Sequence, residues 1–125
     1  MNRTKTVDIK PVYVDPRGSI FDLIEDTVAH VGMVTFAKGA VRANHYHKVS
    51  TQYSYVISGE LDLFTSCVDG SEKKIERLGP GSLTTIPPGI VHKYTAVTEA
   101  TVLDVTTLSR LNNQYETDTV RIAEG

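Results

Sequence analysis

Three histidines and a glutamine are the residues in this chain whose types and spacing best suit chemistry: His45, His47, Gln52 and His92. His45 and His47 are two residues apart, so on an extended strand both side chains leave the same face. His92 follows a Pro-Pro-Gly turn and lies in a second strand-like run, residues 90–94. If the two strands line one cavity, the imidazoles and the amide oxygen can hold one divalent cation. Zn, Ni, Mn, Fe and Cu all accept such ligands.

The elements that must position these residues are short strands, because the apolar pattern has a period of two almost throughout. Apolar alternation also marks the first 24 residues, on both sides of a turn at 15–18, and Asp69-Gly70 predicts a tight hairpin. No window sustains the apolar stripe of a helix, and the tail from Asn112 is left open as an edge strand, a short helix or an arm that contacts a partner. Met33 and Phe36 are expected to line a barrel. The predicted strands are 31–36, 53–58, 61–68, 74–78, 83–86, 91–97 and 101–108.

The composition favours a soluble cytoplasmic domain. The chain has 125 residues, enough for one domain with its own core, and a net charge of −2, which gives no electrostatic footprint for nucleic acid or an anionic membrane. A single cysteine, Cys67, excludes an internal disulfide and suits a reducing compartment. Residues 1–10 are polar, so we expect no signal peptide, and no apolar run approaches the ~20 residues that span a bilayer.

The spacing of the motifs resembles that of the cupin family. The first motif, at 39–59, has Gly39, His45, His47, Gln52 and Gly59, and the second, at 81–96, has Gly81, a Pro-Pro-Gly turn and His92. This resemblance implies an all-β cupin jelly-roll barrel, with 1–125 as a single cupin domain. Cupins usually carry Glu where this chain has Gln52. Gln52 is therefore expected either to bind the metal as a neutral ligand or to hydrogen-bond a ligating histidine, and a neutral shell favours anionic substrates.

Two narrower resemblances lead to different expectations about the metal. The stretch 42–48 with Gln52, together with the segment 15–20, is similar to nucleotide-sugar 3,4-ketoisomerases and capsule-type epimerases, which implies that His47 acts as a base without metal. The ligand spacing also resembles uronate-processing cupins, which implies a metal held by His45, His47, Gln52 and His92. We prefer the metal interpretation, because the chain has the His92 that it requires.

The expected function is isomerisation or epimerisation of a sugar, sugar acid or nucleotide sugar through an enediolate-type intermediate. Tyr94 is two residues after His92 and should face the same cavity, as an acid or a substrate anchor. Arg17 and Arg42 are the candidate clamps for a carboxylate or phosphate, whereas His30 belongs to neither motif and is expected at the surface or a strand edge. A metal-dependent dioxygenase and a non-catalytic small-molecule-binding cupin remain as alternatives. The expected partners are a small-molecule substrate and a second copy in a homodimer, with no nucleic acid and no membrane.

Overall fold

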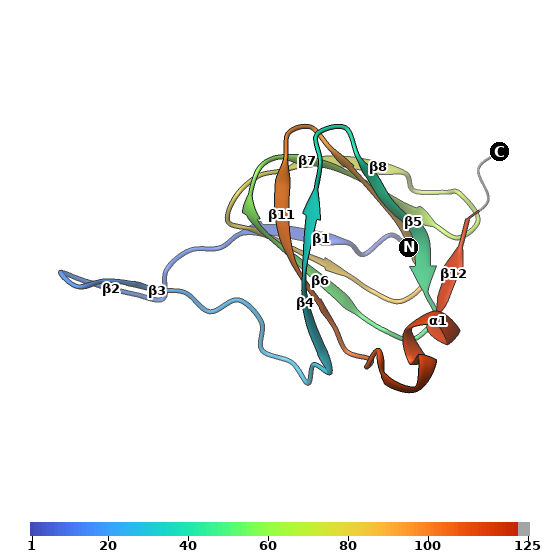
Figure 1. Ribbon diagram of the computed structural model, residues 1–125, viewed down its shortest axis with the longest axis horizontal. Coiled ribbons are helices and arrows are strands. Elements are labelled where there is room, and N and C mark those ends of the chain that lie inside the picture. The colour runs from blue at the N-terminus through green and yellow to red at the C-terminus, as the bar shows by residue number, and fades with distance from the viewer. Residues whose placement is uncertain (123–125) are drawn as a thin grey trace.

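The computed structural model describes residues 1–122 of the chain, and its strands form two facing five-stranded antiparallel sheets and a separate hairpin (Figure 1). One sheet has the order β1-β9-β6-β11-β4, the other the order β12-β5-β10-β7-β8, and the hairpin pairs β2 with β3. The order mixes strands distant in sequence, as in a jelly roll. The elements are β1 (Lys5–Asp8), β2 (Tyr13–Asp15), β3 (Gly18–Ile20), β4 (His30–Phe36), β5 (Val41–His47), β6 (Gln52–Ser58), β7 (Leu61–Cys67), β8 (Lys74–Leu78), β9 (Ser82–Ile86), β10 (Ile90–Ala96), β11 (Ala100–Thr106), a 3-10 turn (Leu111–Asn113), α1 (Gln114–Asp118) and β12 (Thr119–Arg121).

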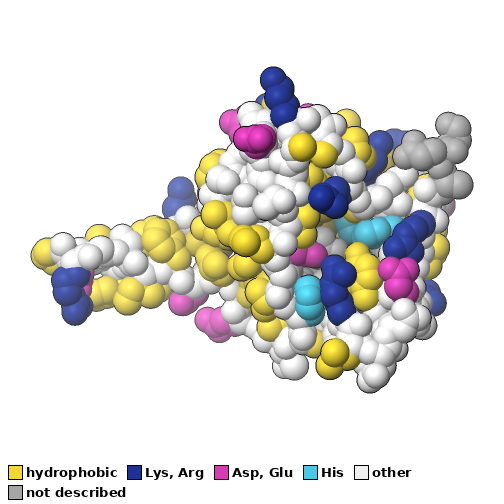
Figure 2. Space-filling view, viewed as in Figure 1, with side chains coloured by type: hydrophobic (Ala, Val, Ile, Leu, Met, Phe, Trp, Pro, Cys, Tyr) yellow, Lys and Arg dark blue, Asp and Glu magenta, His cyan; other side chains and the backbone are white. Residues whose placement is uncertain are grey.

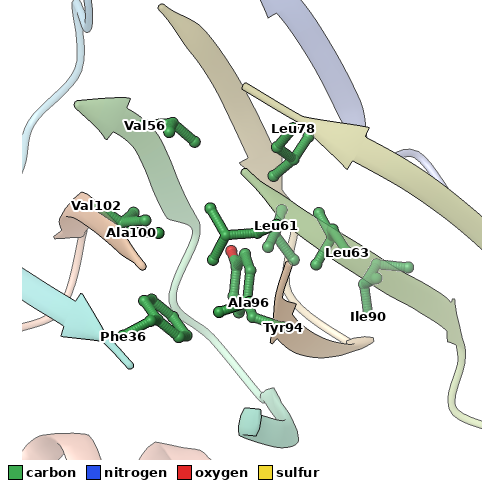
Figure 3. Close-up of a cluster of buried hydrophobic side chains, with 11 residues drawn as sticks. Phe36, Val56, Leu61, Leu63, Leu78, Ile90, Tyr94, Ala96, Ala100 and Val102 are labelled. Atoms are coloured by element: carbon green, nitrogen blue, oxygen red, sulfur yellow. The ribbon is translucent and has the colours of Figure 1, made fainter. Parts of the chain in front are cut away.

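The hydrophobic core lies between the two sheets and is built by the alternation that the sequence shows (Figure 3). Val56 on β6 and Leu61 and Leu63 on β7 are at most 1% exposed, and each has outward-facing neighbours along its strand. Burial of a side chain of this size contributes about 1.5–3 kcal/mol. The core occupies one part of the space between the sheets. The buried polar side chains occupy the remaining part and are backed by this closely packed apolar cluster.

The β2–β3 hairpin projects away from the barrel as an arm, which we define as residues 12–21 (Figure 1). Arg17 and Asp15 form an ion pair at its tip, with Nη2 and Oδ2 2.6 Å apart. Several apolar side chains of the arm are exposed, which the space-filling view shows as a nearly continuous apolar strip that runs onto the barrel (Figure 2). These side chains are Val12, Tyr13, Val14, Ile20 and Phe21.

The all-β class is confirmed, and the seven strands predicted after residue 30 occur with bounds that differ by no more than two residues. No bounds were predicted for β5 or β12. The expectation for Met33 is wrong. Val34 packs on the core and Phe36 is buried, so the alternate positions of β4 point outward, and Met33, next to Val34, is 67% exposed. The polar tail forms both a short helix and an edge strand, since α1 has five residues and β12 pairs with β5. A helix this short carries no apolar stripe for sequence analysis to find. None of the helices in residues 1–122 has the length and apolar character needed to span a bilayer.

Candidate functional site

The three imidazoles predicted to converge do lie together in the interior. β5 and β10 are antiparallel neighbours, and His45 is directly opposite His92 in their register. The ring centroids are 4.7 Å apart for His45 and His92, 4.9 Å for His45 and His47, and 5.4 Å for His47 and His92. One nitrogen of each ring lies within 4.8 Å of the others, and all three side chains are buried. The sequence prediction of a three-histidine cluster is therefore realised in the geometry.

A bulge in β5 brings His45 into this position. Ala43 and Asn44 have φ values of 73° and 72°, and the register with β10 shifts by one residue between His92 and Lys93. A bulge inserts one residue and redirects the side chain that follows it. Asn tolerates the left-handed region, whereas Ala is strained there. The chain thus accepts local strain next to its histidine cluster.

Gln52 reaches the cluster from β6 in the facing sheet. Its Oε1 is 3.0 Å from Nε2 of His47, and its Nε2 is 3.4 Å from Oγ of Ser54, to which it donates. In this orientation the amide oxygen faces His47 and the amide nitrogen faces Ser54. Gln52 is buried like the histidines.

The other nitrogen of His47 fixes its tautomer. Thr119 donates its hydroxyl proton to the carbonyl of Tyr115, at 2.6 Å, and its Oγ1 is 3.2 Å from Nδ1 of His47. Since that proton is committed, Nδ1 of His47 must carry a hydrogen and donate to Thr119. Asp118 favours the same arrangement, because its Oδ2 is 3.8 Å from Nδ1. In neutral His47, Nε2 then bears a lone pair, and it faces the lone pairs of Gln52 Oε1 at 3.0 Å. With the amide in this orientation, a proton shared by the two atoms or a metal ion bound to both would satisfy the two acceptors.

His92 has the same arrangement of hydrogens. Its Nδ1 is 3.0 Å from the carbonyl oxygen of Ile90, which only accepts, so Nδ1 carries the proton. The remaining nitrogen, Nε2, is buried and has no hydrogen-bond partner. A backbone carbonyl that holds one nitrogen and fixes the tautomer is the usual support of a metal-ligating histidine.

Burial keeps the cluster uncharged. It lowers the pKa of His45 to about 4 and that of His92 to about 3, with further lowering by the neighbouring histidines. Burial also lowers the pKa of His47, but the hydrogen bond to Gln52 and the charge of Asp118 oppose the decrease. Metal-binding imidazoles must be neutral. The neutral rings, the unpartnered nitrogen of His92 and the facing acceptors of His47 and Gln52 fit a divalent cation.

A cavity of about 200 Å³ opens beside the cluster. His45 and Gln52 form part of its wall, and Tyr94 lines it as predicted, with its hydroxyl 2.6 Å from Oγ of Ser54. Burial raises the pKa of the Tyr94 phenol well above its ordinary value, so the hydroxyl keeps its proton. Arg42 also lines the cavity, and its guanidinium donates to the carbonyl of Thr35 and lies over the ring of Phe36.

The structure separates some residues that the sequence grouped. His47 and His92 belong to the cluster but are not among the cavity-lining residues. Arg17 lies on the hairpin arm, is paired with Asp15 and does not reach the cavity of its own chain. His30 lies on β4, an edge strand of its sheet, outside the cluster, as expected.

Sequence reasoning missed the contribution of the tail. Asp118 and Thr119 hold His47, because β12 pairs with β5 and places Thr119 opposite His47. Arg110 and Tyr115 line the cavity, with the guanidinium 4.0 Å above the centre of the tyrosine ring. The sequence offered little to find it: residues 112–121 hold one aromatic and two acidic side chains, and no motif surrounds them.

Comparison with known proteins agrees with this architecture. A family model described as cupin domain matches residues 32–106. No curated protein matches the chain. Among solved structures, a sugar 3,4-ketoisomerase from Thermoanaerobacterium thermosaccharolyticum in complex with TDP is similar, with a TM-score of 0.76 and 21% identity over 95% of this chain and 88% of the other.

Two further solved structures are similar over most of their length. A 3,4-ketoisomerase from Helicobacter canadensis has a TM-score of 0.79 and 18% identity, over 98% of this chain and 92% of the other. The dTDP-4-dehydrorhamnose 3,5-epimerase from Sulfolobus tokodaii has a TM-score of 0.74 and 18% identity, over 96% of this chain and 77% of the other. At these identities the similarity establishes the fold.

Proposed function

Since this chain belongs to the cupin domain family, we propose that it is an isomerase or epimerase of a sugar, with nucleotide-linked sugars as the first class to test. The observation that carries the proposal is the facing pair of acceptors, His47 Nε2 and Gln52 Oε1, beside a cavity that also contains a phenol and two arginines. Isomerases of this kind remove a proton from the carbon next to a carbonyl and return it elsewhere. The similarity to the 3,4-ketoisomerases and the 3,5-epimerase supports this choice of reaction.

The cavity suits a ligand with one anionic and one uncharged end. Arg42 and Arg110 supply positive charge to its wall and can pair with phosphate oxygens. Its volume of about 200 Å³ lies below the ~300–1,000 Å³ of sites that enclose a whole drug-sized ligand. We therefore place the sugar inside the cavity and the nucleotide outside it.

The chain's own groups can move the proton. In a metal-free site His47 is the candidate base: Asp118 and Thr119 hold its Nδ1–H, and Nε2 would accept the proton from the sugar carbon once the Gln52 side chain, which lines the cavity and contacts Nε2, turns away. Asp118 stabilises the imidazolium that results. Loss of that proton leaves an enediolate. Tyr94, which stays protonated, is the candidate donor on the same cavity wall.

A metal-bound site is the second form of the same proposal. His45, His47, Gln52 and His92 are the residues that would hold a divalent ion, of which Zn, Ni, Mn, Fe and Cu are the candidates. Such an ion would polarise the sugar carbonyl as a Lewis acid. In this form His47 is a ligand, and Tyr94 remains the acid. The three-histidine set would also accept a redox-active metal, which keeps dioxygenation as the alternative reaction.

We also propose that the chain acts as a homodimer, with the hairpin arm as the contact. An isolated two-stranded hairpin is marginally stable in water, yet this one exposes a run of apolar side chains and is supported by few contacts of its own chain. A second copy that covers the strip would remove this exposure. The strip continues from the arm onto the barrel, which gives the contact a surface larger than the hairpin alone (Figure 2).

One experiment tests the reaction and the two forms of the site together. Protein purified without a histidine tag is analysed for metals, and is then incubated in D2O with TDP-4-keto-6-deoxyglucose before and after chelation. NMR follows deuterium at the carbons next to the keto group and the position of the keto group. We expect exchange and a shifted keto group or inverted centre, both lost in His47→Asn and retained in His30→Gln.

Each alternative has its own outcome. Turnover that survives complete chelation supports His47 as the base, whereas turnover that returns only with one added metal supports the metal form. Substrate-dependent oxygen uptake with iron or copper would replace the isomerase proposal with a dioxygenase. Binding without exchange in any 4-keto nucleotide sugar would leave a non-catalytic binding protein and overturn the proposal.

A further inference from the structure

Asp104 is a carboxylic acid inside the barrel that the proposed reaction leaves without a role. It lies on β11 between Val102 and Thr106, and all three side chains project to the interior face, since Val102 belongs to the core. Its neighbours across the sheet are Gly32 on β4 and Ser54 on β6. Interior positions of a strand normally carry apolar side chains, so a carboxyl group here needs a reason.

The carboxyl group has no hydrogen-bond partner for its buried oxygen. Oδ1 of Asp104 is inaccessible and unpaired, and burial raises the pKa of the group to about 6. The positive charge of Arg110 opposes this increase in the pKa of Asp104. Leaving such an oxygen unpaired costs about 1–3 kcal/mol. Asp104 also lines the cavity, so a hydroxyl group of a ligand bound there can donate a hydrogen bond to its carboxyl group.

Asp104 also places a negative charge in the wall of the cavity. It lines the same cavity as Arg42 and Arg110 and is not one of the residues in the three-histidine group. Its charge reaches the interior: it contributes to the raised pKa values of both Tyr94 and Tyr115. A negative group therefore acts among the side chains around the space where the sugar is placed, while the positive groups are the two arginines that pair with phosphate.

We infer that Asp104 determines the class of sugar that this site accepts: its carboxylate takes a hydrogen bond from a hydroxyl of an uncharged sugar and excludes sugars that bear a carboxylate. This inference rests on the proposed function and narrows it, since it removes sugar acids from the substrates expected from the sequence. Two like charges about 6 Å apart at an effective dielectric constant of about 20 repel by an energy that corresponds to roughly a 100-fold loss of affinity. Arg110 and solvent at the cavity mouth reduce this effect.

A matched pair of ligands tests the inference by binding alone. TDP-glucose and TDP-glucuronate differ only at C6, where a CH2OH group is replaced by a carboxylate, and TDP is the common reference. Titration calorimetry on the full chain should give at least ~10-fold tighter binding of TDP-glucose than of TDP-glucuronate. In Asp104→Asn, which keeps the shape and removes the charge, the ratio should fall below ~3-fold, and a change in phosphate binding through Arg110 cancels because TDP is the reference in each variant. Asp22→Asn, an exposed acid on the surface, should behave as the original chain.

The possible failures are distinguishable. If TDP and both sugars bind but Asp104→Asn leaves the ratio unchanged, the inference about Asp104 is wrong and the proposed function stands. Equal affinity of the original chain for the two sugars overturns the inference in the same way. If neither TDP nor either nucleotide sugar binds, the nucleotide-sugar proposal fails and the inference fails with it. Asp104→Ser, judged by its melting transition, provides a folded second variant if Asn is not tolerated.

Discussion

Asp118 is the residue through which the tail acts on the histidine cluster. Its carboxylate accepts hydrogen bonds from the backbone N–H groups of Val49 and Ser50, at 2.7 Å and 3.1 Å. These two hydrogen bonds hold the carboxylate beside Nδ1 of His47. The carboxylate is thus fixed by the loop that follows β5 and not by the helix that carries it. A change at this position should therefore alter the electrostatics of His47 more than the fold.

We predict that Asp118→Asn lowers kcat of the proposed isomerase by about 10–100-fold, the usual effect of removing a group that orients a functional histidine. KM should change little, because Asp118 does not line the cavity. Initial rates across pH 6–9 are the measurement, with circular dichroism to verify folding. Glu116→Gln, on the same helix but exposed and paired with Arg121, is the control and should be neutral. An unchanged kcat in Asp118→Asn would contradict the proposed role.

The buried histidines also predict a loss of stability in acid. Their folded pKa values of about 4 (His45) and about 3 (His92) lie below the unfolded value of 6.5, so the unfolded chain binds protons that the folded chain does not. Stability should therefore be fully present above pH 6.5 and decrease as pH falls toward 4, by about a few kcal/mol in total. Asp104 acts in the opposite direction, since its folded pKa of about 6 is raised from 3.8, but it is one group against two.

Urea unfolding of chelated protein at pH 7.0, 5.5 and 4.5 measures this effect. His45→Gln should flatten the dependence, because it removes one of the titrating rings. A stability that is constant from pH 7.0 to 4.5 in the original chain would show that the imidazoles are charged or exposed in the folded state. Added divalent metal should raise stability at pH 7 and lose this effect in acid, since protons compete for the same nitrogens.

The turn from β6 to β7 shows why the first motif ends in glycine. Gly59 has φ +84°, and a Cβ added there would lie 2.1 Å from the carbonyl oxygen of Glu99. Gly39, at the start of the same motif, has φ +81° but open space around it. The two glycines share a backbone conformation and differ in their surroundings, so they separate the cost of the conformation from the cost of the contact.

We predict that Gly39→Ala costs about 1 kcal/mol of unfolding free energy, the conformational penalty alone. Gly59→Ala should cost about 3 kcal/mol or more, because backbone atoms of the β10–β11 turn must move in addition. Chemical denaturation of both variants provides the comparison. Equal losses of unfolding free energy in the two variants would contradict this prediction. They would mean that the β10–β11 turn moves away from the added Cβ without a cost in stability.

At the scale of strands the sequence was informative because burial has a period of two. The strands around residues 74–78, 83–86 and 91–97 are predicted almost as they occur, since apolar alternation and Gly or Pro turns coincide there. The outward position of Met33 was missed, because alternation fixes which residues share a face and not which face is the inner one. The convergence of His45, His47 and His92 was predicted from the motif spacing. The β5 bulge that completes this convergence could not be predicted, because no sequence pattern marks it.

The tail was beyond sequence reasoning for a physical reason. The pairing of β12 with β5 joins Thr119 to His47 across 72 residues, and nothing local in residues 112–121 specifies that contact. Arg17 was assigned to substrate binding from its residue type, and the structure places it on the arm, paired with Asp15 and away from the cavity of its own chain. Its role in binding substrate stays a prediction. The roles of His47, Tyr94 and Arg42 remain predictions, as does a cytoplasmic location.

At the scale of the whole molecule, the projecting arm is the feature that a single copy leaves without support. Val14 is 63% exposed on the arm, and Ile75 is 72% exposed on β8, on a different edge of the barrel. Both are β-branched surface residues on strands, so their substitution by lysine introduces the same charge at two different sites. Only one of these sites belongs to the proposed contact.

We predict that Val14→Lys shifts the chain toward a monomer by at least ~10-fold in dissociation constant, because a lysine must be buried without a partner. Ile75→Lys should leave the association unchanged. Sedimentation velocity over a range of concentrations measures both. A monomeric original chain, or dissociation caused by Ile75→Lys and not by Val14→Lys, would contradict the arm as the contact.

The pairing of β12 with β5 has a consequence for incomplete polypeptides. A product of premature termination or proteolysis that stops after β11 would retain every strand of the core cluster and the ring nitrogens of all three histidines. It would lack the carboxylate and hydroxyl that set the hydrogens of His47, and the arginine and tyrosine of the tail that help to wall the cavity. Such a fragment would therefore keep the histidine cluster but lose the groups that fix the hydrogen positions of His47.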